Sequence, residues 1–249
     1  MIKFLKNNVK FITFLVIFGL IGGFFTALYS IEIFSPEILE ETISQVGSVE
    51  ILIAITTIQS LSYAVILGLI GKTLAKKTGL WQELKFEKKP LISVAMISLI
   101  GGAFFTLGDL FIFGSFNEII KNSYLVKPTI NYIIASVTYG GVIEEVMLRL
   151  FLMSLLAFMI MKLSKKEAPS ENQLILANFI VALIFAAGHL PATAQSIGLD
   201  ALIVIRCFLM NGAYGLAFGR MYRKYGLQYA MLAHAGVHII SKLIWIIFI

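Results

Sequence analysis

Charged residues are scarce in this sequence, and their scarcity excludes a water-soluble globular protein. Asp, Glu, Lys and Arg make up 14% of the 249 residues, against about 25% in soluble domains. Hydrophobic residues make up 59% and the mean hydropathy is +0.91, which is more apolar surface than one buried core removes from water. The composition therefore predicts a protein whose solvent is mostly a lipid bilayer.

Cysteine and the common nucleophile motifs are also nearly absent. Cys207 is the only cysteine, so a disulfide scaffold is excluded, and its apolar surroundings favour a small buried hydrophobe. No Gly-x-Ser-x-Gly, P-loop, Gly-x-Gly-x-x-Gly or Cys-x-x-Cys motif occurs, and no histidine neighbours Cys207 in the sequence. Serine and cysteine nucleophiles are therefore not indicated.

Long apolar runs dominate instead. A spanning helix needs about 20 such residues, and seven segments qualify, at approximately 11–29, 49–70, 91–113, 129–163, 172–190, 199–218 and 227–249. The predicted fold class is all-α, a polytopic membrane helical bundle with seven or eight transmembrane helices, in which residues 1–249 form a single integral membrane domain. The fourth segment is too long for one upright crossing, so it must tilt, project from the bilayer or bend at Gly140-Gly141.

The distribution of basic residues predicts the orientation of the bundle. The net charge is +6, but the basic residues lie in short clusters between apolar runs, which favours a topology signal over nucleic-acid binding. With the N-terminus in the cytoplasm, the outer loops hold only Lys121 and Lys127. The fifteen basic residues of the inner segments are Lys3, Lys6, Lys10, Lys72, Lys76, Lys77, Lys85, Lys88, Lys89, Lys162, Lys165, Lys166, Arg220, Arg223 and Lys224. We therefore expect a cell-membrane protein with a cytoplasmic N-terminus and an external C-terminus.

Ionisable residues inside the predicted spans gather in three of them. These residues are Glu144, Glu145 and Arg149 in the fourth span, His189 at the end of the fifth, and His234 and His238 in the seventh. Each motif taken singly is more often structural. Because an ionisable group in a membrane costs at least a few kcal/mol, the set as a whole predicts a functional site.

The spacing of these residues divides them into pairs. Glu145 and Arg149 are four residues apart and can form an ion pair on one helix face, while Glu144 is turned about 100° away. One glutamate is therefore expected to be structural and the other chemical. His234 and His238 are also four residues apart, so both imidazoles project from one face of the last helix.

Two kinds of hydrolytic chemistry fit this set. A glutamate in water-poor surroundings can act as a general base toward water, with histidines orienting the water or stabilising an oxyanion. Alternatively, Glu144, His189, His234 and His238 could bind zinc. The zinc motif His-Glu-x-x-His is absent, however, because Ala235 follows His234.

The order of these motifs resembles that of a known family. Glu-Glu-x-x-x-Arg in one span, Phe-x-x-x-His in the next and a His-Ala motif in a late span are similar to the CPBP family of intramembrane glutamic endopeptidases, the prokaryotic relatives of the CAAX prenyl endopeptidase. The stretch from Tyr214 to Gly219, followed by Ala233-His234-Ala235, is similar to the family's last block. The resemblance covers about residues 129–245, which we expect to be the catalytic half of the chain.

The resemblance implies a role for each matching residue. Glu144 corresponds to the glutamate that activates water, and Glu145 and Arg149 complete the first motif. His189 corresponds to the histidine that works with the glutamate on the water. His234 matches the histidine assigned to oxyanion stabilisation.

His238 departs from the family pattern, which usually places asparagine four residues after the histidine of the third motif. A histidine can still donate a hydrogen bond, but its protonation depends on pH. The departure leaves an oxyanion role for His238 open and strengthens the zinc alternative.

The leading hypothesis is an endopeptidase that cleaves a membrane-associated peptide or protein without a cofactor, with the lipid bilayer as its other partner. The alternatives are a zinc-dependent membrane protease, a non-catalytic scaffold or immunity protein of the same fold, and a proton-coupled or metal transporter. No inverted repeat supports the transporter.

Three further ionisable residues lie within spans and are not assigned to the site. Asp109 is expected close to the outer interface, and Lys242 is expected to have a partner inside the bundle. Arg206 has no partner that the sequence reveals.

Overall fold

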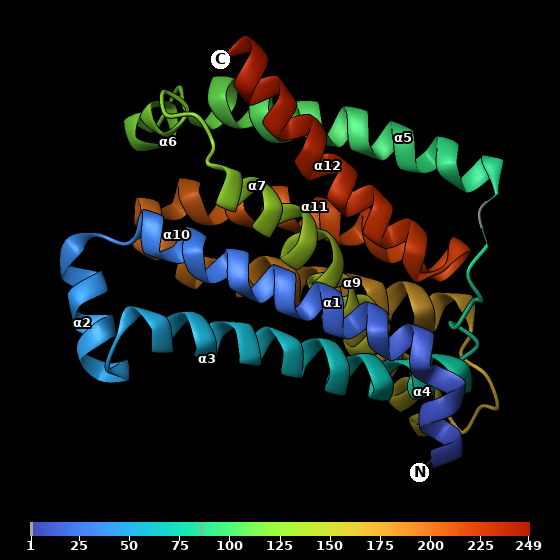
Figure 1. Ribbon diagram of the computed structural model, residues 1–249. Helices are drawn as coiled ribbons and strands as arrows, with labels where there is room; N and C mark the ends of the chain where they lie inside the picture. Colours follow the sequence, from blue (N-terminus) through green and yellow to red (C-terminus); the bar gives the residue numbers. More distant parts are fainter. Residues whose placement is uncertain (1, 86) are drawn as a thin grey trace.

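The computed structural model describes residues 2–85 and 87–249, with side chains from residue 8 onward, so the basic side chains of Lys3 and Lys6 lie outside the description (Figure 1). In the described part of the chain, seven helical segments are long and apolar enough to cross a membrane. They are Asn8–Ile33, Val49–Lys77, Lys88–Phe113, Ile130–Leu163, Glu171–Ile197, Ala201–Tyr225 and Leu227–Phe248. The predicted all-α polytopic membrane bundle is confirmed.

Several spans are composite, with α-helical and π-helical (η) sections. The first three are α1 (Ile2–Ile33), then α3 (Val49–Ser62) with η1 (Tyr63–Leu67) and α4 (Gly68–Lys77), then α5 (Lys88–Ala103) with η2 (Phe104–Phe113). The fourth is α7 (Ile130–Ala135), η3 (Ser136–Glu144), η4 (Val146–Met153) and α8 (Ser154–Leu163). The last three are α9 (Glu171–Gly188) with α10 (Leu190–Ile197), α11 (Ala201–Tyr225) and α12 (Leu227–Phe248). Two connections contain short helices, α2 (Pro36–Val46) and α6 (Glu118–Ser123).

The two ends of the bundle are distinct. Figure 1 shows α2, α6 and α10 at one end, and the connections from α4 to α5, α8 to α9 and α11 to α12 at the other. The N-terminus lies at the end with these connections, and the C-terminus lies toward the end with the short helices. Termini at opposite ends are what an odd number of crossings produces.

Local sequence signals fix the ends of the helices that carry the site. The Asp200 carboxylate accepts a hydrogen bond from the backbone amide of Ile203 at 2.8 Å and caps α11. Ser170 and Gln173 form a capping box at the start of α9. The turn from α11 to α12 needs a φ of 99° at Gly226, a conformation that favours glycine.

The fourth span lies at the centre of the bundle, where η3 packs against α1 and α12. The span is helical from Ile130 to Leu163, and Gly140-Gly141 lies in its π-helical section. Gly141 allows η3 and α12 to approach closely, since a Cβ atom on Gly141 would lie 2.8 Å from the Cβ of Ala235. The glycine pair therefore serves as a helix contact, and the helix there is widened into a π-helix, a feature frequent at functional sites.

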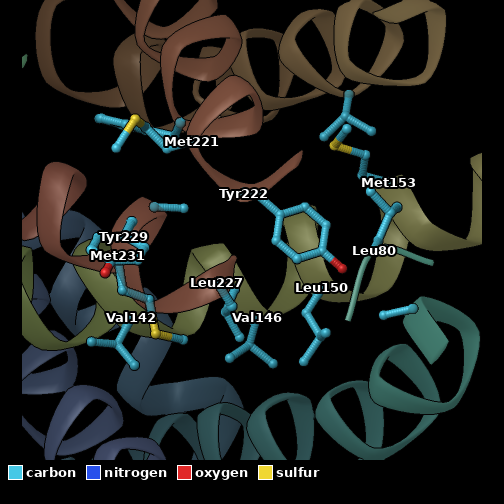
Figure 2. Close-up of a cluster of buried hydrophobic side chains, with 14 of the residues drawn as sticks. Leu80, Val142, Val146, Leu150, Met153, Met221, Tyr222, Leu227, Tyr229 and Met231 are labelled. Carbon is cyan, nitrogen blue, oxygen red and sulfur yellow. The ribbon is translucent and has the colours of Figure 1, made fainter. Parts of the chain in front are cut away.

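One large cluster of buried apolar side chains surrounds the fourth span. Figure 2 shows its members Leu80, Val142, Val146, Leu150, Met153, Met221, Tyr222, Leu227, Tyr229 and Met231. Tyr222 is buried with its hydroxyl group 2.8 Å from the Ser154 hydroxyl, so its polar atom is satisfied. Large apolar side chains remain exposed on every span, as expected for a surface that faces lipid.

Gly141→Ala should destabilise the bundle, because the added methyl group meets both the backbone and the side chain of Ala235. We expect a loss of about 1–3 kcal/mol, typical of overpacking, as a lower midpoint of thermal unfolding in detergent. Gly212→Ala is the matched control, since its Cβ would meet only Ala186, at 4.0 Å. Equal midpoints for the two variants would contradict the close contact of η3 with α12.

Candidate active site

Three spans bring the predicted site residues together within the bundle. Glu144, Glu145 and Arg149 come from η3 and η4, His189 follows α9, and His234 and His238 come from α12. Glu144 interacts electrostatically with His234, and His238 interacts with His189. Residues more than 80 positions apart in the sequence therefore form one cluster.

A shared carboxylate lies at the centre of this cluster. Oε1 of Glu145 accepts a hydrogen bond from Nδ1 of His234 at 2.8 Å and forms an ion pair with a guanidinium nitrogen of Arg149 at 3.2 Å. The side chains of Glu145 and Arg149 are both 0% exposed. The predicted ion pair on one helix face is confirmed, and it also fixes the histidine of the last span.

Arg149 extends this connection to the sixth span. Its guanidinium donates a hydrogen bond to the backbone carbonyl of Gly215 at 3.1 Å. It also lies 4.9 Å from the ring centroid of Phe185 and 5.7 Å from that of Phe218, where the faces of aromatic rings favour a cation. Arg149 thus ties the fourth span to both α9 and α11.

The two histidines of α12 form a stack with an aromatic ring. The His234 ring lies between Phe218, at a centroid distance of 4.4 Å, and His238, at 5.0 Å. The edge of Phe185 approaches the same ring at 5.9 Å. The prediction that both imidazoles project from one face of the last helix is confirmed.

The Nε2 atoms of this pair converge beside Gly140. A Cβ atom on Gly140 would lie 3.1 Å from Nε2 of His238 and 3.9 Å from Nε2 of His234. The Nδ1 atoms point elsewhere, toward Glu145 and Lys242 respectively. A side chain at position 140 would therefore crowd the two ring nitrogens, which glycine avoids.

His189 occupies the junction between α9 and α10. Its Nδ1 donates to the backbone carbonyl of Phe185 at 2.8 Å, and its ring packs edge-on against Phe185 at 4.7 Å. Since a carbonyl can only accept, Nε2 of a neutral His189 keeps its lone pair. Pro191 lies in the first turn of α10, where a residue without an N–H group is tolerated.

Glu144 differs from its neighbour in being only half-buried. Among the described residues its carboxylate makes no hydrogen bond or ion pair, although it interacts electrostatically with Arg149 and His234. The two glutamates therefore differ in their surroundings, because Glu145 is held by two partners and Glu144 has no such partner among the described residues.

Comparison with known families agrees with this geometry. Residues 126–240 match the family model described as Type II CAAX prenyl endopeptidase Rce1-like. This region is similar to the Rce1-like family. No curated protein and no solved structure matches the chain.

The Rce1-like match confirms the resemblance of residues 129–245, and it contains the whole predicted site. The family is described as one of endopeptidases, and the chain has seven apolar helices of spanning length among its described residues. Together they support a multi-pass membrane protease of the CAAX type.

In the part of the chain that the structure describes, no three His, Cys, Asp or Glu side chains are grouped to hold a metal ion. The Nε2 atoms of His234 and His238 are the ring nitrogens that do not contact Glu145 or Lys242, so the zinc alternative is a question for experiment. We test the zinc alternative separately below with a chelator.

A second ionic cluster lies outside the Rce1-like site and explains Arg206. Its guanidinium makes two hydrogen bonds of 2.5 Å to the Asp109 carboxylate, which joins η2 to α11. The Tyr124 hydroxyl donates to the same carboxylate at 3.0 Å. Burial and Asp109 raise the pKa of Tyr124 above its usual range, so the hydroxyl remains a donor. In the sequence, the signal was that Asp109 and Arg206 each lie in a span without an evident partner. Because the two residues are 97 positions apart, their spacing along the chain could not predict that they pair.

Lys242 has the predicted partner inside the bundle. Its ammonium lies 3.3 Å from Nδ1 of His238 and 4.2 Å from the ring centroid of Tyr132. Lys242 thus belongs to the surroundings of the site, although the sequence analysis did not assign it there.

Arg149→Met should strongly destabilise the protein, since it leaves the carboxylate of Glu145 buried without its cation. We expect a loss of about 3–5 kcal/mol, typical of breaking a buried pair, measured as unfolding by denaturant in detergent. In the control, Glu118→Gln breaks an exposed pair with Lys121 and should cost at most about 1 kcal/mol. Similar losses in both variants would show that the buried pair does not hold the site together.

Proposed function

We propose that this protein is an intramembrane endopeptidase in which Glu144 activates the water that hydrolyses a peptide bond of a membrane-associated peptide or protein. The observation that carries the proposal is the division between the two glutamates. Glu145 is fully buried and bound to Arg149 and His234, whereas Glu144 is half-buried and unpaired among the described residues. A general base must be partly exposed and unpaired, as Glu144 is, because it must reach a water molecule.

His189 is the second group proposed to bind the water. Its Nδ1–H is donated to Phe185, so Nε2 can accept a hydrogen bond from the water while Glu144 takes the proton. The hydroxide then attacks the carbonyl carbon of the substrate. Glu144 later delivers the proton to the departing amine, and the peptide bond breaks.

His234 and His238 are proposed to stabilise the oxyanion through their Nε2 atoms, which converge beside Gly140. His234 already gives its Nδ1–H to Glu145, so donation from Nε2 requires the imidazolium form. Glu145 stands to His234 as the acidic partner stands to the histidine of a catalytic triad.

Glu144→Gln should abolish cleavage while keeping the fold, because the amide cannot accept the proton of water. We expect the rate to fall by at least about 10²–10⁴-fold, the usual contribution of a general base. The measurement is cleavage of a panel of membrane-associated peptides, prenylated and unmodified, by protein purified in detergent. Glu171→Gln, at an exposed position, is the matched control.

A chelator, the biological activity of Glu144→Gln and an ion-flux assay separate the alternatives. Cleavage that survives excess chelator supports the glutamate mechanism, whereas loss on chelation would move the histidines into a zinc site. Full biological activity of Glu144→Gln would favour the scaffold, and ion flux in liposomes without cleavage would favour the transporter.

We infer that the N-terminus of this protease lies in the cytoplasm. The connection between α8 and α9 carries Lys165 and Lys166, whereas the end with α2, α6 and α10 is poor in basic residues. Because cytoplasmic loops are enriched in Lys and Arg, the end with the basic connections is assigned to the inside.

Two introduced cysteines test this orientation. In right-side-out vesicles, a membrane-impermeant maleimide should label Lys121→Cys directly and Lys166→Cys only after permeabilisation. Both positions are exposed, and the native Cys207 is buried, so it provides a low background. The reverse labelling pattern would invert the topology.

A further inference from the structure

One buried cation near the site has no role in the proposed reaction. Lys242 is 2% exposed, and among the described residues its ammonium has no carboxylate partner. A lysine at this depth in a membrane is costly and calls for specific contacts. Both Lys242 and its aromatic neighbour Phe105 lie outside the matched residues 126–240.

Three side chains surround the ammonium of Lys242. It lies over the ring of Tyr132, at 4.2 Å from the centroid, and over the ring of Phe105, at 5.6 Å. Its closest polar neighbour is Nδ1 of His238, at 3.3 Å. Aromatic faces attract a cation, so these contacts offset part of the cost of burying the ammonium.

In the contact between Lys242 and His238, the donor and the acceptor can be assigned. An ammonium group has three hydrogens and no lone pair, so it can only donate. Nδ1 of His238 must then be the acceptor, and the hydrogen of a neutral His238 must be on Nε2. That Nε2 atom is the one that points into the space beside Gly140, next to Nε2 of His234.

We propose that Lys242 is a positioning residue that fixes the tautomer and ring orientation of His238, so that Nε2–H is held ready to donate to the oxyanion. The inference rests on the proposed function for its catalytic meaning. The alternative tautomer would present a lone pair to a developing negative charge, which repels it. Lys242 thus makes a reliable hydrogen-bond donor of a side chain that could otherwise be either donor or acceptor.

The ring contacts of His238 are consistent with a fixed orientation. It stacks on His234 at a centroid distance of 5.0 Å, and the ring of Phe105 approaches it edge-on at 6.0 Å. Packing therefore sets the plane of the imidazole, and Lys242 selects which nitrogen carries the proton within that plane.

The tautomer can be observed without any assay of activity. We would record nitrogen NMR spectra of protein labelled with ¹⁵N-histidine in detergent micelles, and identify the His238 signals by their loss in His238→Asn. We expect wild-type His238 to be protonated at Nε2, with Lys242→Arg retaining this state and Lys242→Met giving a mixture of tautomers. A wild-type His238 protonated at Nδ1, or an unchanged spectrum in Lys242→Met, would overturn the proposal.

A double-mutant cycle tests the catalytic consequence. Lys242→Met should lower kcat by about tenfold or more, short of the 10²–10³-fold that loss of an oxyanion donor costs, with little change in KM. In a His238→Asn background the amide donor has no tautomer to select, so adding Lys242→Met should change kcat by less than about twofold. Equal losses in both backgrounds would assign Lys242 a purely structural role.

Different results would show whether the proposed function or the inference about Lys242 fails. If wild-type protein cleaves no peptide but His238 responds to Lys242 in the NMR spectra, the proposed function fails and the positioning contact stands. If cleavage depends on Glu144 but not on the pairing of Lys242 with His238, only the present inference fails. If Lys242→Met does not fold, the wild-type spectrum and Lys242→Arg still decide the tautomer.

Discussion

The site depends on the carboxylate of Glu145, which is shared by Arg149 and His234, with all three side chains buried. A lone charge in this position would be prohibitively costly, so each of the three groups requires the others. Arg149 in turn binds the backbone of Gly215 in α11. One ionic interaction therefore joins the fourth, sixth and seventh spans and sets the relative positions of the groups proposed to act on substrate.

Close helix packing at Gly140 and Gly141 also positions the residues of the site. Gly141 lets η3 contact α12 at Ala235, and the neighbouring Gly140 faces the Nε2 atoms of both histidines. Consecutive residues of a helix point to different sides of its axis, so Gly141 contacts α12 at Ala235 while Gly140 lies beside the histidine rings. The same offset separates Glu144 from Glu145, which gives two adjacent carboxylates different surroundings.

The sequence could predict those parts of the site that depend on spacing within one helix. Glu145 with Arg149, and His234 with His238, are each four residues apart, and both relations are present in the structure. Lys242 is four residues after His238, so the same spacing on one helix also accounts for this contact.

Contacts between spans could not be predicted in this way. The pairing of Arg206 with Asp109 and that of His234 with Glu145 depend on how helices pack, which hydropathy does not encode. The seven spans themselves were predictable, because length and apolar composition suffice for them.

The functional unit extends beyond the region that matches the family. Phe105 in η2 contacts both His238 and Lys242, and the Tyr214 hydroxyl donates to the carbonyl of Gly101 in α5 at 2.6 Å. The third span therefore forms one wall around the histidine pair, although it precedes residue 126, where the match begins. Since Phe105 limits where the ammonium of Lys242 and the ring of His238 can lie, changes in this span should alter the donor geometry of the site without touching any residue of the family motifs.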